Sequence, residues 1–456
     1  MAVSCNSVEK NKTEKAELWL TSLDGKHLLQ KQEIPVDANQ TAPVDGTITI
    51  NDSIPYQTMD GFGYTLTGGS AMHIHKMSDT ARADLLQELF GQEENDIGVS
   101  YLRVSIGASD MDAAPFSYDD LAEGATDVDL NHFNLSQDTL HLIPVLKEIL
   151  KISPSIKILG SPWSPPVWMK DNGDTRGGSL LEKYYPAYAD YFVKYIKAMS
   201  DNGISIDAIT IQNEPLHPGN NPSLLMKAVQ QGEFIKNNLG PAFAENNLKT
   251  KIIIYDHNAD RIDYPISILN DPETAKYIDG SAFHLYGGQV NAISKVHYAH
   301  PKKNLYFTEQ WVGAPGDFAK EMEWHIENLI IGATRNWCKT VLEWNLAADE
   351  NQDPHTDRGG CDRCLGAITI TGDKISREPA YYIIAHASKF VSPGSVRIDS
   401  NLLKDVPNVA FKTPEDNIVL ILQNKTDKVK TIAVQLNDKK VNVELSGKDI
   451  GTLLLK

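Results

Sequence analysis

Along most of the chain, short apolar runs alternate with longer segments in which apolar residues recur at helical spacing. Such runs are typical of buried strands, and the longer segments are typical of amphipathic helices. Strands are predicted at residues 61–66, 99–106, 156–160, 206–212, 251–255, 280–284, 304–308 and 339–343. Helices are predicted between them, including residues 78–90, 137–150, 182–199 and 223–239, with a last helix near 379–389. Eight successive strand–helix units predict an α/β fold of the (β/α)8 barrel type.

Both ends of the chain show short alternating strands and no helical period. Residues 16–29 alternate and turn at Asp24-Gly25, and residues 47–50 are a further strand candidate. After Pro393, strands are predicted at 409–412, 418–423, 431–436 and 441–445. Isolated hairpins are marginally stable, so we expect the two ends to join in one β-sandwich. The expected division is a tail at 1–15, sandwich strands at 16–59, the barrel at 60–390 and the rest of the sandwich at 391–456.

The composition narrows the class of partner. The chain has 456 residues, 41% of them hydrophobic, which is enough for a large barrel and a smaller appendage. It carries 43 Lys and Arg against 60 Asp and Glu, and the net charge of -17 opposes binding to nucleic acid. A neutral substrate such as a polysaccharide fits better. No apolar stretch reaches about 18 residues, so no membrane span is expected.

Two glutamates stand where an apolar run meets a turn. Glu214 lies in Gln212-Asn-Glu-Pro215, and Glu309 ends Tyr306-Phe-Thr-Glu309. Proline cannot donate to a strand ladder and is expected to hold Glu214 in an extended conformation at the rim of the sheet. Parallel barrel strands direct their carboxyl ends to one face, where such barrels carry their chemistry. Two acids facing one cleft can break a glycosidic bond.

The other predicted strand ends add amides, histidines and aromatic residues to this face. Sugars present flat C–H faces and a rim of hydroxyls, which aromatic rings and hydrogen-bonding side chains recognise. The set is Arg103, Asp110, Trp163, Asn213, Asp256, His257, His284, Tyr286, Trp311, Trp344 and Asn345. Each has an ordinary structural alternative, such as a buried ion pair for Arg103 or core packing for the tryptophans.

The chain resembles glycoside hydrolase family 30, within the clan of retaining barrel enzymes that carry the acid/base on strand four and the nucleophile on strand seven. The resemblance covers nearly the whole length. It is carried by Asp60-Gly-Phe-Gly63, Leu102-Arg-Val104, Ser161-Pro-Trp-Ser-Pro-Pro166, Gln212-Asn-Glu-Pro215, Phe283-His-Leu-Tyr286, Tyr306-Phe-Thr-Glu309 and Glu343-Trp-Asn345.

This resemblance implies a role for each candidate. Glu214 is the expected acid/base and Glu309 the expected nucleophile, with their carboxyls about 5 to 5.5 Å apart. The mechanism requires a raised pKa at Glu214 and an ionised Glu309. Arg103 and Tyr286 match positions that hold the nucleophile, and Asn213 matches the contact to the sugar 2-hydroxyl. Residues that line the subsite of the cleaved sugar are matched by Asp110, Trp163 and Trp344. Further candidates for substrate contact are His257, His284 and Trp311. Asn345 is a supporting residue.

Residues around the cleft entrance bear on the substrate. Leu285 and the loop at 359–369 resemble the bacterial and fungal β-1,6-glucanase branch more than the glucosylceramidase branch. We therefore expect an endo-β-1,6-glucanase without cofactor or metal, and a glucosidase or glucosylceramidase type of exo-enzyme is the alternative. Cys361 and Cys364 can form a disulfide that stiffens this loop, or hold zinc with two further ligands. Cys338 is expected to be buried in a strand.

Two other classes of protein remain open. His73 and His75, with His257, His284 and Asp349, imitate a metal-dependent amidohydrolase, although His73 and His75 lie beyond the first strand end. A glycan-binding protein without turnover would keep the aromatic residues and need not keep both acids. At the N-terminus, Cys5 followed by a polar segment resembles the lipid-bearing start of a bacterial lipoprotein, or belongs to a disordered tail. A monomer in the bacterial cell envelope is expected, with any membrane anchoring through Cys5.

Overall fold

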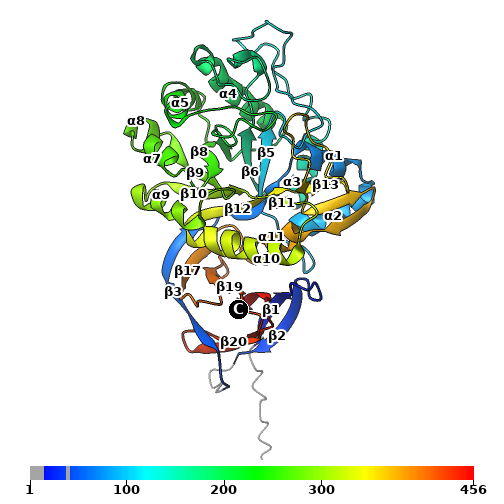
Figure 1. Ribbon diagram of the computed structural model, residues 1–456, viewed down its shortest axis with the longest axis vertical. Coiled ribbons are helices and arrows are strands. Elements are labelled where there is room, and N and C mark those ends of the chain that lie inside the picture. The colour runs from blue at the N-terminus through cyan, green and yellow to red at the C-terminus, as the bar shows by residue number, and fades with distance from the viewer. Residues whose placement is uncertain (1–14, 37–41) are drawn as a thin grey trace, which may run out of the picture. The chain divides into compact units, whose positions relative to one another are not determined.

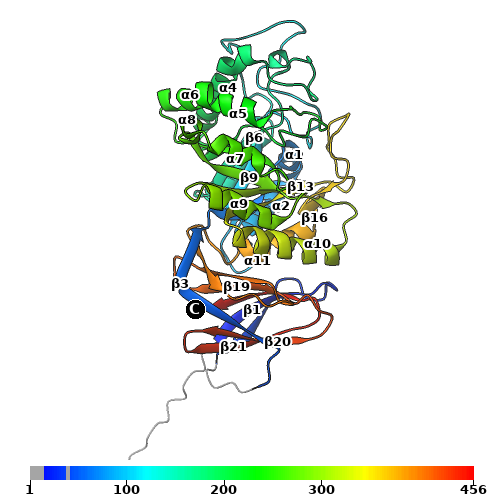
Figure 2. The same ribbon diagram turned by 60° about the vertical axis from the view of Figure 1, so that its left-hand side comes forward.

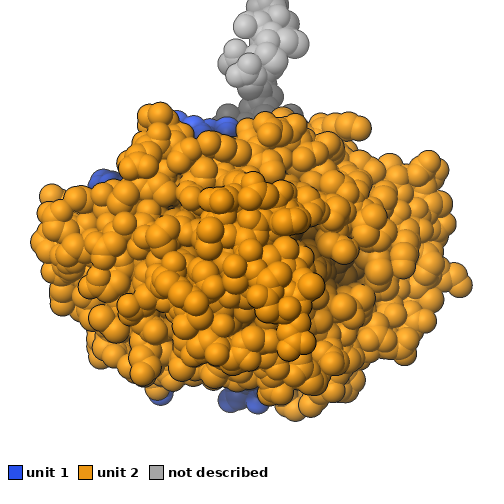
Figure 3. All heavy atoms as spheres, turned by 90° about the horizontal axis from the view of Figure 1, so that it is seen from above, with its two compact units in different colours: residues 1–55, 398–456 blue, residues 56–397 orange. Residues whose placement is uncertain are grey.

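The computed structural model describes residues 15–36 and 42–456. Cys5, and with it the lipoprotein prediction, lies outside these residues. The chain divides into two compact units, of which one comprises Tyr56–Arg397 and the other combines Met1–Pro55 with Ile398–Lys456. Figure 3 colours the two units and shows a hollow in the face of the larger unit that is turned to the viewer.

The larger unit is built around a closed barrel of eight parallel strands (Figures 1 and 2). The strands are β4 (Gly61–Thr65), β5 (Tyr101–Ile106), β6 (Lys157–Pro162), β7 (Ala208–Thr210), β8 (Lys251–Asn258), β9 (Ile278–His284), β10 (Asn304–Glu309) and β12 (Cys338–Asn345). They follow one another around the barrel in chain order, and β12 closes the ring by pairing with β4. All eight predicted strands are present, so the predicted barrel is confirmed. Its interior is filled by Tyr101, Leu159, Ala208, Ile253, Ala282, Tyr306 and Leu342.

Helices surround the barrel strands (Figures 1 and 2). They are α1 (Gly68–Lys76), α2 (Asp79–Phe90), α3 (Leu142–Ile152), α4 (Tyr185–Asp201), α5 (Ala228–Phe234), α6 (Gly240–Glu245), α7 (Asp263–Leu269), α8 (Pro272–Ala275), α9 (Ile293–Ala299), α10 (Phe318–His325) and α11 (Pro379–Ser388). Ser78 caps α2 as predicted, because its side chain accepts a hydrogen bond from the amide of Ala81. Helix α5 begins later than predicted, since the amides of Ser223 and Leu225 instead donate to carbonyls of the loop after β6.

The smaller unit contains a nine-stranded sheet in which strands from both ends of the chain are neighbours. Its strands are β1 (Lys15–Thr21), β2 (Gln30–Pro35), β3 (Gly46–Thr58), β17 (Val396–Ser400), β18 (Asn408–Lys412), β19 (Ile418–Gln423), β20 (Lys430–Leu436), β21 (Lys439–Leu445) and β22 (Ile450–Leu455). Strand β22 lies between β1 and β19, antiparallel to both. Alternate residues such as Leu18, Leu420, Val443 and Leu453 meet in one buried core. The predicted sandwich is confirmed, although β17 and β22 were not predicted and β2 begins after the expected turn.

Short strands elaborate the loops at the carboxyl ends of the last barrel strands. Strand β11 (Val312–Gly313) follows β10 and pairs with β14 (Cys364–Leu365), while β13 (Ala347–Ala348) follows β12 and pairs with β15 (Ile368–Thr371). Strand β16 (Lys374–Arg377) completes this small sheet. Among the described residues, no helix is long and apolar enough to cross a membrane.

Candidate active site

The carboxyl ends of the barrel strands bring the predicted acids into one buried cluster. Glu309 is the last residue of β10, and His284 is the last residue of β9. Arg103 lies within β5, and Glu214 lies just beyond the end of β7. All four residues are at most 7% exposed. Residues that are far apart in the sequence therefore meet at one end of the barrel.

Glu214 and Glu309 both face the imidazole of His284. Nδ1 of His284 lies 3.1 Å from Oε1 of Glu214 and 3.6 Å from Oε1 of Glu309. One carboxylate oxygen from each glutamate and a ring nitrogen of His284 all lie within 4.8 Å of one another. Retaining glycosidases hold their two carboxyls about 5 to 5.5 Å apart, whereas inverting enzymes hold them roughly 6.5 to 9.5 Å apart. The short distance between the two carboxylates is therefore typical of a retaining enzyme.

The backbone at Glu214 is left-handed, with a φ of 44°. The prediction that Pro215 holds this residue extended is therefore wrong. Few non-glycine residues adopt a positive φ, and those that do cluster at functional sites, where the surroundings hold the strain. Here the amide of Glu214 donates to the carbonyl of Asp256 at 3.0 Å, and its carbonyl accepts from the amide of His217 at 2.8 Å. Asp256 is itself left-handed, with a φ of 63°.

Arg103 holds Glu309 by charge and hydrogen bond, as the sequence predicts. Its Nη1 donates to Oε2 of Glu309 at 2.6 Å, and its Nη2 donates to Oδ2 of Asp256 at 2.8 Å. The same Nη2 is 2.7 Å from Oδ1 of Asn213 and 3.1 Å from Oγ of Ser161. Burial disfavours the charge of Arg103, but the carboxylates of Asp256 and Glu309 outweigh burial and raise its pKa.

Asp256 connects these groups, and no specific role was predicted for it. Burial alone would raise the pKa of Asp256, but the charge of Arg103 and the hydrogen bonds to the carboxylate hold the pKa well below its usual range. Its strand-end position beside His257 is the one local signal of its importance. The carboxylate accepts hydrogen bonds from Thr308 and His284 at Oδ1 and from Arg103, Ser161 and Thr210 at Oδ2.

His284 is the second cation of the cluster. Burial would lower the pKa of its imidazole, but the surrounding carboxylates of Glu309, Asp256 and Glu214 raise it to about 10. Its Nε2 lies 3.1 Å from Oδ1 of Asp256, on the side of the ring away from the two glutamates. The imidazole is therefore protonated at neutral pH, and it presents an N–H donor to each side.

The predicted order of the two glutamate pKa values is reversed in the free protein. At Glu214 burial raises the pKa, but the hydrogen bond and charge of His284 outweigh burial and lower it. At Glu309 burial and the repulsion from Glu214 and Asp256 outweigh the attraction of His284 and Arg103, so the pKa is raised. Two carboxylates this close resist ionising together, so they titrate as a coupled pair.

Trp163 and Trp344 contact Arg103 and are almost fully buried. They are 1% and 4% exposed, and their ring centroids lie 5.3 Å apart. The guanidinium carbon of Arg103 lies 4.7 Å from the ring centroid of Trp163 and 5.7 Å from that of Trp344. Such cation–π contacts favour a cation held away from water. Both rings therefore support the cation that binds Glu309.

Tyr286 and Trp311 are the more exposed residues beside the cluster, whereas His257 is buried. Tyr286 is 41% exposed, and its hydroxyl donates to Oε1 of Glu309 at 3.0 Å, as its predicted role requires. Trp311 is partly exposed. Nε2 of His257 lies 3.9 Å from Oε1 of Glu214, and burial lowers the pKa of this imidazole to about 4. The exposed parts of Tyr286 and Trp311 offer ring surface to a sugar.

Several buried polar atoms at these strand ends have no hydrogen-bond partner among the described residues. They include Oδ1 of Asp110, Nε1 of Trp163 and Oε1 of Gln310, a residue that was not predicted. Burial and the charge of Glu309 raise the pKa of Asp110 to about 8. A buried unpaired polar group costs about 1 to 3 kcal/mol, so such atoms favour a ligand rich in hydroxyls.

Asn345 and the cysteines have structural positions beside this cluster. Oδ1 of Asn345 accepts from the hydroxyl of Ser70 at 2.7 Å, so this predicted supporting residue anchors the start of α1. Cys361 and Cys364 form a disulfide, and the zinc alternative is therefore wrong. Cys338 is buried in β12 with a free thiol.

Two groups within the described ranges have the geometry to hold a metal ion. One is Glu214, His284 and Glu309, and the other is Asp119, Asp127 and His132. In the first group Glu309 already binds Arg103 and accepts from the Tyr286 hydroxyl. His73 and His75 lie in α1 and belong to neither group, which contradicts the arrangement imagined for an amidohydrolase.

Two facing carboxyls at the C-terminal face of a (β/α)8 barrel, beside unpaired polar groups and partly exposed rings, define a glycoside hydrolase. The chain matches the glycosyl hydrolase family 30 TIM-barrel domain over residues 59–391 and the beta-sandwich domain of the same family over residues 394–453. The protein belongs to glycosyl hydrolase family 30.

Curated relatives and a solved structure agree with this assignment. The endo-1,6-beta-D-glucanase of Neurospora crassa is 33% identical over 432 residues, which cover 89% of this chain and 88% of that protein. The lysosomal acid glucosylceramidase of Mus musculus is 29% identical and covers 86% of this chain and 79% of that protein. A solved endo-beta1,6-glucanase superposes with a TM-score of 0.90 at 34% identity, covering 97% of this chain and 99% of that one.

Proposed function

We propose that this protein is an endo-β-1,6-glucanase that retains the anomeric configuration, with Glu214 as acid/base and Glu309 as nucleophile. The observation that carries the mechanism is the distance between their carboxylates, within 4.8 Å of each other and of His284. The substrate is supported by the 33% and 34% identity to two endo-β-1,6-glucanases over nearly the full chain.

In the first step, an oxygen of Glu309 attacks the anomeric carbon while the glycosidic C–O bond breaks. The proton of Glu214 passes to the leaving oxygen, and a covalent glycosyl–enzyme ester remains. Arg103 and the Tyr286 hydroxyl keep the attacking carboxylate oriented. The reaction needs a proton on Glu214 while Glu309 is ionised. The two carboxyls lie close together, because both face Nδ1 of His284.

In the second step, water replaces the departed sugar. Glu214, now ionised, takes a proton from this water as its oxygen attacks the anomeric carbon and releases Glu309. The imidazolium of His284 stabilises the ionised Glu214 between the two steps. Two inversions at the same carbon give a product of retained configuration.

The remaining site residues are assigned to sugar binding or to support of the catalytic groups. Asp110, Trp163 and Gln310 offer buried unpaired polar atoms to sugar hydroxyls. Asn213, whose amide oxygen accepts from Arg103, is assigned to the contact with the 2-hydroxyl. Tyr286 and Trp311 provide ring surface, His257 supports Glu214 as a neutral imidazole, and Trp344 backs Arg103.

Product analysis tests this proposal. The purified protein is incubated with β-1,6-, β-1,3- and β-1,4-linked glucans and with an aryl β-glucoside, and products are followed by chromatography and NMR. We expect a ladder of oligosaccharides from the 1,6-linked glucan and from neither of the other glucans, released first as β-anomers, with only slow cleavage of the aryl glucoside. Glu309→Gln should abolish release, while the matched substitution at the exposed Glu415 should leave it unchanged. First release of α-anomers would contradict the mechanism.

An exo-acting glucosylceramidase or glucosidase is the second candidate, because a glucosylceramidase is also a full-length relative. Rapid cleavage of the aryl glucoside or of glucosylceramide, with inert polymers, would favour it. Binding of 1,6-linked glucan that persists without any turnover would instead indicate a glycan-binding protein.

We propose that the enzyme works as a monomer in an oxidising compartment, such as the bacterial cell envelope. The Cys361–Cys364 disulfide supports this location, because such bonds persist outside the reducing cytosol. Attachment of a lipid at Cys5 stays a prediction from the sequence. Mass spectrometry of the native protein checks the lipid and the disulfide together.

A further inference from the structure

The segment between β13 and β14, residues 349–363, is bonded to the loops that follow three earlier barrel strands. The amide of Thr356 donates to the carbonyl of Asp110 at 3.1 Å, in the loop after β5. The hydroxyl of Thr356 donates to the carbonyl of Asn221, in the loop after β7. The guanidinium of Arg358 makes two hydrogen bonds of 3.0 Å to the carboxylate of Asp174, in the loop after β6. This segment is therefore fixed on one side by three loops of the active face.

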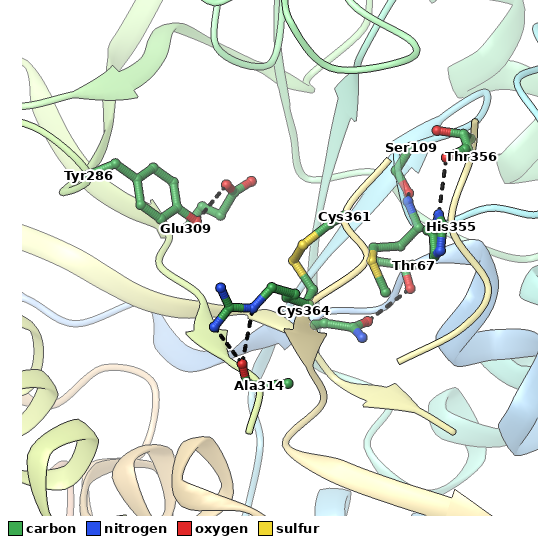
Figure 4. Close-up of a disulfide and its surroundings, with 12 residues drawn as sticks. Thr67, Ser109, Tyr286, Glu309, Ala314, His355, Thr356, Cys361 and Cys364 are labelled. Carbon is green, nitrogen blue, oxygen red and sulfur yellow. Dashed lines mark hydrogen bonds between the residues drawn. A yellow bond between two sulfur atoms is a disulfide. The ribbon is translucent and has the colours of Figure 1, made fainter. Parts of the chain in front are cut away.

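The other side of the segment is bonded to the chain that follows Glu309. Cys361 and Cys364 close a tight turn, and Cys364 is the register partner of Gly313 where β14 pairs with β11. Within that turn, the carbonyl of Arg363 accepts from the amide of Ala314 at 2.8 Å. The guanidinium of Arg363 donates back to the carbonyl of Ala314 at 2.7 Å. Figure 4 draws the disulfide and the hydrogen bonds that the Ala314 carbonyl accepts, in the same view as Glu309 and Tyr286.

Trp311 lies between Glu309 and β11, and it packs against the same apolar cluster as the disulfide. A side chain on Gly313 would come within 3.1 Å of the Trp311 ring, so that ring lies directly over the short strand. The ring is partly exposed, unlike the two buried tryptophans of the site. It belongs to one apolar cluster with both cysteines, and the other members are Met111, Trp163 and Trp344.

Two strands of two residues each are too short to hold an indole ring in place by themselves. We propose that the Cys361–Cys364 disulfide positions Trp311 against the bound glucan chain, so that cleavage of polymeric substrate depends on the oxidised turn while bond breaking at small substrates does not. Cys361 and Cys364 are positioning residues in this inference, which rests on the proposed glucanase function. Reduction frees the turn, and the stacking surface of Trp311 loses its fixed place beside the substrate.

The test compares the wild type with the double variant C361S/C364S. Both are assayed on long β-1,6-linked gluco-oligosaccharides and on an aryl β-glucoside, each with and without a thiol reductant. We expect the double variant to raise KM for the oligosaccharides about tenfold, the size of effect that a displaced aromatic contact produces. The kcat for the aryl glucoside should change less than about twofold. Reductant should reproduce the change in the wild type and have no effect on the double variant.

A second measurement links the effect to Trp311. Trp311→Ala is expected to raise KM for the oligosaccharides in the oxidised protein and to add little in the C361S/C364S background, because the two changes remove the same contact. Additive effects would overturn the inference, as would an unchanged KM in the double variant or an equal loss of kcat on both substrates. Absence of any oligosaccharide cleavage by the oxidised wild type would instead contradict the proposed function. Thermal unfolding of each variant confirms that the compared proteins are folded.

Discussion

Among the site residues, Arg103 is the one whose replacement we expect to lower the free energy of unfolding most. Arg103→Met keeps an unbranched side chain of similar length but leaves Glu309 and Asp256 buried without their cation. The substitution breaks hydrogen bonds of 2.6 and 2.8 Å to these carboxylates, and bonds to Asn213 and Ser161 as well. Removing one partner of a buried ion pair costs about 3 to 5 kcal/mol, because the other charge stays buried and unpaired.

This cost can be measured as a shift in thermal unfolding. At about 2.1 cal/mol/K of unfolding entropy per residue, a unit spanning Tyr56–Arg397 shifts by roughly 1.4 °C per kcal/mol, so Arg103→Met should lower Tm by about 4 to 7 °C. Activity should fall further than any loss of folded protein would explain. Without the cation the pKa of Glu309 rises further, and a smaller fraction of Glu309 is ionised and able to attack. Differential scanning calorimetry and the acidic limb of the kcat/KM profile against pH give the two readings.

Two further variants separate charge from geometry. Arg103→Lys keeps a cation but cannot fork between two carboxylates, so its Tm and activity should lie between those of the wild type and Arg103→Met. Arg261→Met removes an exposed arginine that forms an ion pair with Asp263, and it should change stability by at most about 1 kcal/mol. An Arg103→Met protein as stable as Arg261→Met, with an unshifted acidic limb, would refute this account of the cluster.

Glu309→Gln should abolish turnover on every substrate. Glu214→Gln should retain the first step on aryl glucosides whose leaving group needs no proton, and burst kinetics can detect that step. Equal losses in both variants would contradict the assigned roles. His284 has a folded-state pKa of about 10, above its unfolded value, so its contribution to stability is complete below about pH 6.5 and lost as pH rises through 10. His284→Gln should therefore flatten the fall of unfolding free energy over this range, as urea titrations at several pH values can show. Asp256→Asn should lower both kcat and Tm, because the neutral amide leaves Arg103 and His284 without the carboxylate that they share. A change in kcat alone would show that Asp256 does not hold the cluster together.

The barrel could be predicted from the sequence because its parallel strands are buried on both faces and read as continuous apolar runs. Residues 252–254 and 305–307 are examples, and each run ends at a residue of the site. Strand β17 was missed because Arg397 and Asp399 interrupt its apolar positions. The late start of α5 follows from hydrogen bonds to a loop distant in sequence, which no local pattern records.

Local sequence patterns likewise reveal only part of the site. Glu214 and Glu309 are recognisable because each stands at a strand end within a characteristic short motif. The central place of Asp256 depends on partners from five other strand ends or adjoining segments, so it emerges only when the barrel closes. The reversed pKa order has the same origin, because the carboxylates of Glu309, Asp256 and Glu214 raise the pKa of His284, and its hydrogen bond and charge lower the pKa of Glu214. A pattern can locate a carboxyl, but its protonation depends on neighbours that the fold supplies.

The dense bonding of Asp256 has a consequence for how such an enzyme can diverge. Each of its two oxygens already serves several donors, so a substitution at any one donor disturbs the attachment of the others. Descendants with new substrate preferences are therefore expected to inherit this cluster intact and to vary at the rim, around Tyr286 and Trp311. Directed-evolution libraries aimed at other glucans should likewise randomise the rim and leave the residues around Asp256 untouched.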